Sequence, residues 1–233
     1  MVALAPGIFW LWYFRARDRL RPEPRHLVAR TFFLGALASI VAAILEGLAF
    51  EITGLSFRGP FGASTVASAI LIGVLEEAMK FVAVFAGIYR HAHFDEVVDG
   101  IIYAVAASLG FATVENLVYV LQGGLSVGVL RAGLSIPAHA FFGALLGFNM
   151  GLAKFSGPKE RAWLVSGLAL AAGAHATYDA LLFTYNLAAA LVIPLLFVLW
   201  WLVVRRVRHA LAIDAQRLGG DPQAGEEPHH SPQ

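Results

Sequence analysis

Long apolar runs recur along this chain, and they constrain its fold more than any other feature. A run of about 18 or more apolar residues can cross the hydrocarbon core of a membrane as a helix. Six runs reach that length, and they cover residues 31–50, 63–89, 97–122, 125–155, 162–185 and 187–204. A further run at residues 1–14 is about half as long as a full span needs. We therefore predict an all-α, polytopic membrane protein with about seven transmembrane helices, the first of them short.

The composition agrees with a membrane protein and excludes several classes of function. Of the 233 residues, 58% are hydrophobic and 14% are charged, whereas soluble domains carry roughly 25% charged residues. The chain has no cysteine, which excludes disulfides, thiolate metal sites and a cysteine nucleophile. The first apolar run is not typical of a signal peptide, because its charges follow it and no cleavage site comes after it.

The basic residues are distributed unevenly between the loops, which predicts an orientation in the membrane. Lys and Arg in short loops favour the cytoplasmic side. Fourteen of the 17 basic residues fall in alternate loops, at residues 15–30, 90, 154–161 and 205–217. We expect the N-terminus outside and the C-terminus in the cytoplasm. We also expect an integral membrane domain at residues 1–208 and a disordered polar tail at residues 209–233.

Ionisable residues lie inside several of the predicted spans. An ionisable group within a membrane is a functional hypothesis by default, because no water is present to satisfy its charge. These residues, with one neighbouring amide, are Glu46, Glu76, Glu77, Lys80, Glu115, Asn116, His139, His175 and Asp179. Glu76, His139 and His175 fall near the middle of their spans, and Glu115 and Asp179 lie nearer the outer helix ends. A single shared polar site would satisfy these groups mutually.

Spacing within a helix predicts which of these side chains meet. Glu76 and Glu77 precede Lys80 by four and three residues, so either carboxylate can reach its ammonium group. Asp179 follows His175 by four residues and can orient the imidazole ring. Because Glu76 and Glu77 are adjacent, they point about 100° apart. We expect one of them to face a site directly and the other to hold a neighbouring helix.

Each polar residue also has a purely structural interpretation. A histidine within a span often makes a helix–helix hydrogen bond. Lys80 is more typical of a counter-ion than of a catalyst, and Glu46 of a packing or loop contact. Arg131 lies near an outer interface and can extend its side chain toward water. A stripe of small residues predicts close helix packing: Gly143, Gly147 and Gly151.

Carboxylates and imidazoles that meet can activate water for attack on a peptide bond, as general bases or as metal ligands. The chain lacks H-E-x-x-H, which excludes a zincin-type metalloprotease. The G-x-S-x-G match at residues 124–128 falls in a predicted loop between helices, so we interpret it as chance. Intramembrane aspartyl proteases share the "YD" at residues 178–179, but their second motif, Gly-x-Gly-Asp, is absent.

Four segments together resemble the PrsW family of intramembrane proteases. They are "EEAMK" (76–80), "FATVEN" (111–116), "HAFFGALLG" (139–147) and "HATYD" (175–179). The N-terminal "APGIFWLWYFRARDRLRPEP" and "FDEVVDGIIYA" (94–104) also resemble that family, and the match extends over about residues 4–185. The family is related to the type II CAAX prenyl endopeptidases and to a non-catalytic scaffold subunit of γ-secretase.

The resemblance implies an intramembrane endopeptidase in the bacterial plasma membrane. Its expected reaction is the first cleavage, on the extracytoplasmic side, of a membrane-spanning anti-sigma factor or a similar single-span protein. No nucleic-acid partner is expected. The family is often described as metalloproteases, and Zn²⁺ is then the candidate cofactor. A Glu–His mechanism without metal is also argued for the CAAX relatives, so both mechanisms stay open.

The expected roles within the site follow from the residue types. We predict Glu76 or Glu77 as the base that activates water, and Lys80 as a supporting group. The other predicted catalytic residues are Glu115, His139, His175 and Asp179, and those that could bind a metal are Glu115, His139 and His175. Asn116 could hydrogen-bond the substrate backbone, which must unwind to expose its amide.

Two other classes of function are compatible with buried polar residues. A non-enzymatic membrane scaffold or chaperone is one, but a scaffold does not need a pair of adjacent glutamates. A proton-coupled transporter is the other, since buried Glu and His could relay protons. Inverted repeats would favour a transporter, and the sequence contains none. We therefore favour the protease.

Overall fold

The computed structural model describes residues 4–18, 20–58 and 60–219, and in these residues it contains helices and no strands. The helices are α1 (Ala5–Arg15), α2 (Arg25–Thr53), α3 (Ala63–Gly87), α4 (Val97–Lys154), α5 (Glu160–Leu182) and α6 (Val192–Arg217). Two short 3₁₀ helices, Gly157–Lys159 and Leu187–Leu191, precede α5 and α6. The predicted all-α class is confirmed for this part of the chain.

Helix α4 is two helices joined by a sharp reversal at Gly124. As one straight helix its 58 residues would extend about 87 Å, far more than the roughly 30 Å hydrocarbon core of a bilayer. Gly124 has φ 79° and ψ −176°, a conformation that glycine adopts readily because it lacks a Cβ atom. The two halves of α4 therefore form a hairpin, and the described residues contain seven α-helical segments.

Small residues bring the two halves of α4 into direct backbone contact. A Cβ atom added to Gly147 would overlap the carbonyl oxygen of Gly100, and one added to Gly151 would overlap that of Val97. A Cβ atom on Gly143 would overlap the side chain of Ser108. The close packing predicted for this glycine stripe is confirmed.

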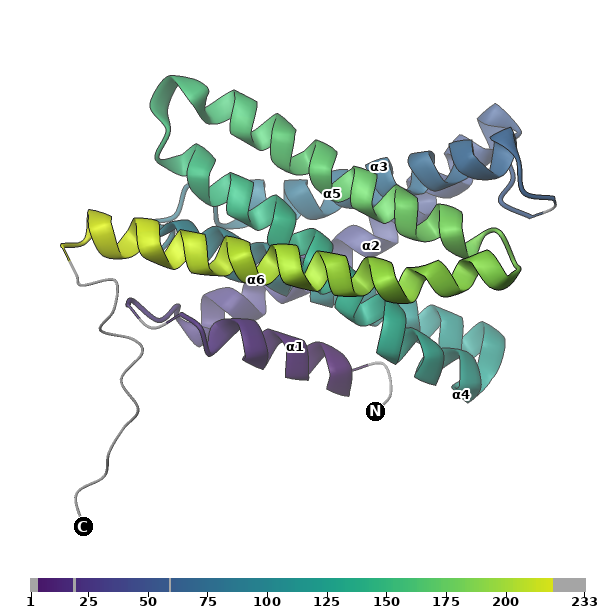
Figure 1. Cartoon of the computed structure of the whole chain (residues 1–233), viewed down its shortest axis with the longest axis horizontal. Helices are drawn as coiled ribbons and strands as arrows, with labels where there is room; N and C mark the ends of the chain where they lie inside the picture. The colour runs from purple at the N-terminus through teal and green to yellow at the C-terminus, as the bar shows by residue number, and fades with distance from the viewer. Residues whose placement is uncertain (1–3, 19, 59, 220–233) are drawn as a thin grey trace, which may run out of the picture.

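The α4 hairpin is the centre of the molecule, and the other helices pack around it. Much of α4 is buried, and α1, α2, α3, α5 and α6 all contact it. Successive helical segments run in opposite directions along the long axis (Figure 1). The reversal inside α4 lies at the right-hand end of this view, and α6 ends at the left-hand end.

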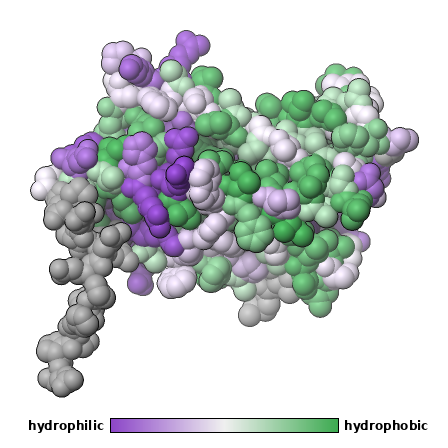
Figure 2. Space-filling model, viewed as in Figure 1, coloured by the Kyte–Doolittle hydropathy of each residue, from purple (hydrophilic) through white to green (hydrophobic). Residues whose placement is uncertain are grey.

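The outer surface of this bundle is largely apolar. Large side chains on α2 and α6 are exposed, among them Phe33, Ile44, Ile52, Phe197 and Trp201. On the face seen in Figure 2, hydrophobic residues cover most of the surface, and most hydrophilic residues gather at the left, where α6 ends. Such a surface suits contact with lipid rather than water.

By length and composition, three stretches of the described residues can cross a membrane: α2, the folded α4 and residues Leu187–Arg217. The predicted total of seven spans is not tested by this criterion and stays a prediction.

Helix α6 extends to Arg217, beyond residue 208, where we expected the membrane domain to end. Its last turns have a partner, because the Asp214 carboxylate accepts hydrogen bonds from the backbone nitrogens of Val97, at 2.7 Å, and Val98, at 2.9 Å. These amides belong to the first turn of α4 and have no partner within that helix. Residues 209–217 are thus helical instead of disordered, and residues 220–233 lie outside the described residues.

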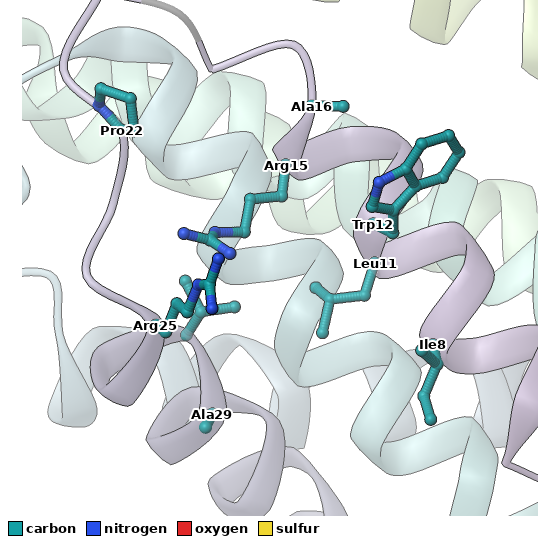
Figure 3. Close-up of a pocket in the computed structure, with 9 residues that line it drawn as sticks. Ile8, Leu11, Trp12, Arg15, Ala16, Pro22, Arg25 and Ala29 are labelled. Atoms are coloured by element: carbon teal, nitrogen blue, oxygen red, sulfur yellow. The ribbon is translucent and has the colours of Figure 1, made fainter.

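A hollow of about 480 Å³ lies between α1 and the start of α2. Ile8, Leu11 and Trp12 line its apolar part, and the guanidinium groups of Arg15 and Arg25 lie close together beside it (Figure 3). The described residues that line this hollow include no carboxylate and no imidazole. It therefore lacks the groups that could activate water.

Candidate active site

A second cavity, of about 650 Å³, lies inside the helix bundle and is lined by most of the predicted polar residues. Ionisable lining residues come from α2, α3, both halves of α4, and α5, among them Glu46, Glu76, Glu115, Arg131, His139, His175 and Asp179. Phe57, Arg58, Gln122 and Phe183 also line it. These four residues lie at helix ends or loops toward the Gly124 reversal, so the cavity extends toward that end of the bundle.

Lys80 holds the charges of α3 together. Its ammonium nitrogen donates to Glu76 Oε2 at 3.1 Å and to Glu77 Oε1 at 2.7 Å, and it lies 2.9 Å from His139 Nδ1. The side chain is fully buried, so a nearby carboxylate is needed to keep its charge stable. The contacts predicted from the three- and four-residue spacing are therefore present, and they extend to His139 of α4.

The two glutamates have different surroundings. Glu76 lines the cavity. Glu77 is completely buried and its Oε1 atom lies 2.9 Å from His175 Nδ1 on α5. One glutamate thus faces the site and the other holds a neighbouring helix, as the 100° offset predicted.

Close backbone contact between α3 and α5 brings Glu77 to His175. A Cβ atom added to Gly73 would lie 2.9 Å from the carbonyl oxygen of Ala172 and 2.9 Å from the backbone nitrogen of Ala176. Only a residue without a side chain fits this approach without movement of the helices. Gly73 and His175 therefore belong to the same contact between α3 and α5.

His175 is oriented mainly by Glu77, whereas we expected Asp179 to orient it. The Nε2 atom of His175 lies 3.6 Å from Asp179 Oδ2 and 3.8 Å from Glu76 Oε2, and both distances exceed ordinary hydrogen-bond length. The shorter contact, from Nδ1 to Glu77, comes from α3. The i,i+4 spacing placed Asp179 on the correct face of α5, but it could not reveal the nearer carboxylate on another helix.

The second histidine, His139, is held by both halves of α4. Its Nε2 atom lies 3.0 Å from Glu115 Oε2, and the other oxygen of Glu115 lies 2.6 Å from Arg131 Nη2. Arg131 also contacts Ser135 Oγ at 3.0 Å and lies over the ring of Tyr119 at 3.8 Å. Arg131 is therefore the counter-ion of Glu115 in the cavity wall, and not a side chain extended toward an outer interface.

The sequence interpretation missed Arg131 because the reversal at Gly124 returns it to Glu115. One signal was available, since a glutamate inside a span requires a counter-ion and Arg131 is the next cation along the chain. We expected Glu46 to make a packing or loop contact. It lines the cavity and its Oε1 atom is buried with no hydrogen-bond partner among the described residues, which does not fit a simple packing contact.

Asn116 is not brought to the cavity. It is fully buried and is not among the described residues that line the cavity. Both polar atoms of its side chain lack a hydrogen-bond partner within the part of the chain that the structure describes. A role for Asn116 in binding the substrate backbone stays a prediction.

Three of the converging residues could hold a metal ion. Glu76, His139 and His175 each offer a ligand atom, and these atoms lie within 4.8 Å of one another. Two histidines and one glutamate form a known ligand set of catalytic zinc. The Glu77–His175 contact resembles the carboxylate that commonly supports a metal-binding imidazole. Lys80 lies beside His139 Nδ1, so an ion bound through that atom would lie close to another positive charge.

The comparison with known proteins decides the family. A family model described as "PrsW family intramembrane metalloprotease" matches residues 23–205. This chain belongs to the PrsW family. Protease PrsW of Bacillus subtilis (strain 168) is 34% identical over 216 residues, which are 92% of this chain and 96% of that protein. Protease PrsW of Geobacillus kaustophilus (strain HTA426) is 33% identical over 207 residues, 89% of each chain. No solved structure matches.

Membership of the PrsW family confirms the resemblance carried by the four motifs, and it makes the chain a protease. The matched region contains every residue from Glu46 to Asp179 that lines the cavity. The family description also implies a metal, and the ligand set of Glu76, His139 and His175 fits one. Within the PrsW family, the polar cavity of this chain is therefore the candidate site of peptide hydrolysis.

Proposed function

We propose that this PrsW chain makes the first, extracytoplasmic-side cleavage of a membrane-spanning anti-sigma factor or a similar single-span protein in the bacterial plasma membrane. The observation that carries the proposal is the position of Glu76. It lies near the middle of α3, in the wall of an internal cavity, beside Lys80 and within 3.8 Å of His175. A carboxylate held there can act on water inside the membrane.

The proposed orientation has seven spans, with the N-terminus outside and the C-terminus in the cytoplasm. Alternation of the helical segments (Figure 1) and the concentration of arginine in residues 15–30 support it, because basic loops favour the cytoplasm. In this orientation the Gly124 end of the bundle faces outside. Water would then enter the cavity past Arg58 and Gln122, which line it toward that end.

Hydrolysis requires a proton acceptor and a stabiliser of the developing oxyanion. We assign Glu76 as the base: it takes a proton from water while the water oxygen adds to the carbonyl carbon of the scissile peptide bond. The C–N bond then breaks, and the proton passes to the leaving nitrogen. His175 Nε2 lies 3.8 Å from Glu76 Oε2 and makes no short hydrogen bond, so when protonated it can donate to the oxyanion. The ring nitrogens of His139 already face Lys80 and Glu115, so we assign His139 to the wall beside the reacting bond.

Buried partners keep these groups in place. The Oε1 atom of Glu77 lies within hydrogen-bond distance of His175 Nδ1, and the Oε2 atom of Glu115 lies 3.0 Å from His139 Nε2. Lys80 remains positive between Glu76 and Glu77, which lowers the cost of two carboxylates in a buried position. Asp179 adds a further carboxylate to the cavity near His175. We assign these four residues supporting roles around Glu76.

The residues that would hold Zn²⁺ are Glu76, His139 and His175. Such an ion would polarise the scissile carbonyl and make water a stronger nucleophile at neutral pH. Glu76 would then serve as a ligand, and Asp179 is the cavity carboxylate placed to accept the proton. Glu115, which we also expected as a ligand, pairs with Arg131 through Oε1 and is not in the group of three whose ligand atoms lie within 4.8 Å of one another.

The deciding experiment combines Glu76→Gln with zinc analysis. We expect the variant to lose cleavage of a reconstituted single-span substrate by about 10²-fold or more, the scale of general-base catalysis. Glu51→Gln is the control, because Glu51 is an exposed glutamate of α2. The zinc content of both purified proteins separates the mechanisms: zinc in the wild type that is lost in Glu76→Gln supports a ligand role. Full activity of Glu76→Gln would contradict the proposal.

A further inference from the structure

Two family motifs, the N-terminal segment and "FDEVVDG", make no contribution to the cavity, yet they meet at the opposite end of the bundle. Asp18 and Glu23 come from the loop between α1 and α2, and Glu96 and Asp99 from the start of α4. Asp99 and Glu115 lie on the same half of α4 and are 16 residues apart, which corresponds to about 24 Å along a helix. This cluster of acids is therefore separate from the candidate active site.

We propose that Asp18, Glu96 and Asp99 form a binding site for a hard divalent cation, Mg²⁺ or Ca²⁺. Each of the three residues offers a carboxylate oxygen, and these oxygens lie within 4.8 Å of one another. All three residues are buried, with 5% of Asp18 and none of Glu96 or Asp99 exposed. Three carboxylates that approach so closely away from water repel one another unless a positive charge joins them.

The hydrogen bonds of the cluster leave one set of oxygens free. Asp18 Oδ2 accepts the backbone N–H of Glu23 at 2.7 Å, and Asp99 Oδ2 accepts that of Glu96 at 2.7 Å. The remaining oxygens, Oδ1 of Asp18 and Oδ1 of Asp99, are buried without a hydrogen-bond partner among the described residues. One oxygen of each aspartate is thus used to fix the side chain, and the other remains available for a ligand.

Glu96 provides an independent argument. Both of its carboxylate oxygens are buried and have no hydrogen-bond partner in the part of the chain that the structure describes, although the residue is fully enclosed. A buried carboxylate without any hydrogen bond is costly. Its ligand atom is within 4.8 Å of those of Asp18 and Asp99. A cation at this point would satisfy both oxygens at once.

The backbone around these residues is already ordered for binding. Glu96 is the N-cap residue of α4, and Asp99 accepts from the backbone nitrogens of Asp95 and Glu96, which fixes the turn before the helix. Glu23 lies next to this group. Carboxylate oxygens of Glu23, Asp95 and Asp99 lie within 4.8 Å of one another, and Glu23 also accepts a hydrogen bond from the Tyr103 hydroxyl. An ion would therefore join the loop between α1 and α2 to the start of α4.

The chemistry of the ligands selects the class of ion. The clustered ligands are all carboxylates, without histidine or cysteine, and oxygen-only sites suit Mg²⁺ and Ca²⁺. Two arginines near the cluster form described ion pairs with acids other than the three proposed ligands: Arg21 pairs with Asp95, and Arg217 pairs with Asp214. Arg15 lies nearby and donates to the backbone oxygen of Glu23.

The three carboxylates are crowded and shielded from water, so they cannot all remain ionised by themselves. Either a bound cation or bound protons must supply the missing charge, and these two possibilities differ in experiment.

The test is thermal unfolding of the full chain, purified in lipid nanodiscs and treated with EDTA. Tryptophan fluorescence measures Tm with added MgCl₂ or CaCl₂, and with NaCl at the same ionic strength. We expect one or both divalent ions to raise Tm by about 3 °C or more at saturation, because a ligand that binds only the folded state stabilises it. Terbium luminescence, excited through Tyr103, provides a direct measure of ion binding at the site.

Glu96→Gln is the informative variant, because the Glu96 carboxylate makes no described hydrogen bond that the change could break. We expect it to fold like the wild type in EDTA but to lose both the Tm increase and the terbium signal. Glu51→Gln, with an exposed acid on α2, should keep both. Glu76→Gln should also keep both, so the result is independent of the proposed protease mechanism.

Two results would overturn the cation site. If neither ion changes Tm beyond the NaCl control, the acids hold shared protons instead of a metal. If the Tm increase and the terbium signal persist in Glu96→Gln, the ions bind elsewhere on the protein.

Discussion

Glu77 makes shorter contacts with Lys80 and His175 than Glu76 does, although the two glutamates are adjacent. Its Oε1 atom lies 2.7 Å from Lys80 Nζ and 2.9 Å from His175 Nδ1, and it therefore connects α3 to α5. The two glutamates should accordingly differ in what they contribute. Glu76, in the cavity wall, should matter most for the reaction, and Glu77 should matter for both the reaction and the stability of the folded protein.

We predict that Glu77→Gln lowers Tm by about 5 °C more than Glu76→Gln. The removal of one partner from a buried ion pair leaves the other partner uncompensated, which costs several kcal/mol. Thermal unfolding of both variants in the same nanodiscs measures the difference. Equal Tm values for the two variants would mean that the contact between Glu77 and His175 does not hold the helices together.

At the scale of the helices, the α4 hairpin places both residues of the His139–Glu115 contact. The two halves are joined at Gly124 and touch along Gly143, Gly147 and Gly151. Because His139 lies one turn before Gly143 on the second half, any separation of the halves also moves His139 relative to Glu115. The packing of this hairpin is therefore coupled to the geometry of the site.

We predict that Gly147→Ala destabilises the protein by about 1–3 kcal/mol, the usual cost of an overpacked core, and lowers proteolysis. The added methyl group would overlap the backbone of Gly100. Gly133→Ala is the matched control on the same half of α4, since a Cβ atom there meets nothing within 4 Å. Thermal unfolding and a cleavage assay measure both effects. Equal stability of the two variants would contradict the role assigned to the stripe.

At the scale of the whole molecule, the two ends of the bundle differ in their chemistry. The polar cavity extends toward the end formed by the Gly124 reversal, whereas the buried acids Asp18, Glu96 and Asp99 lie at the end where α4 begins. The proposed orientation places the first end outside the cell and the second in the cytoplasm. Two measurements can test this assignment.

The first measurement is the labelling of single cysteines, which suits a chain with no native cysteine. We predict that Leu125→Cys reacts with an impermeant reagent in sealed cells, and that Arg25→Cys reacts only after the membrane is opened. Both positions are exposed on the protein surface, so burial does not explain a difference between them. Labelling of position 25 from outside would refute the orientation.

The second measurement locates the cleaved bond in a single-span substrate. We predict a cut near the outer boundary of the substrate helix or just beyond it, because water enters the cavity from the Gly124 end. Residues there also unwind more readily than those at the membrane centre, where each freed backbone group costs several kcal/mol, to order of magnitude. Mass spectrometry of the two fragments identifies the bond. A cut in the cytoplasmic third would contradict both the orientation and the first-cleavage assignment.

The sequence by itself determined the all-α class, the approximate bounds of the helical segments and the family. Apolar runs longer than about 18 residues leave few alternatives to a helix in a membrane. The contacts of Lys80 with Glu76 and Glu77 were also predictable, because helical geometry brings together residues three and four positions apart.

Only the tertiary structure decided which helices supply the partners of each charge. The contact of His175 with Glu77 joins residues 98 positions apart and depends on the close approach of α3 and α5 at Gly73. The pairing of Arg131 with Glu115 depends on the reversal at Gly124, and the meeting of Asp18 with Glu96 and Asp99 depends on the position of the loop after α1. Helical periodicity specifies the face on which a side chain lies, but the packing of helix against helix determines what that face meets.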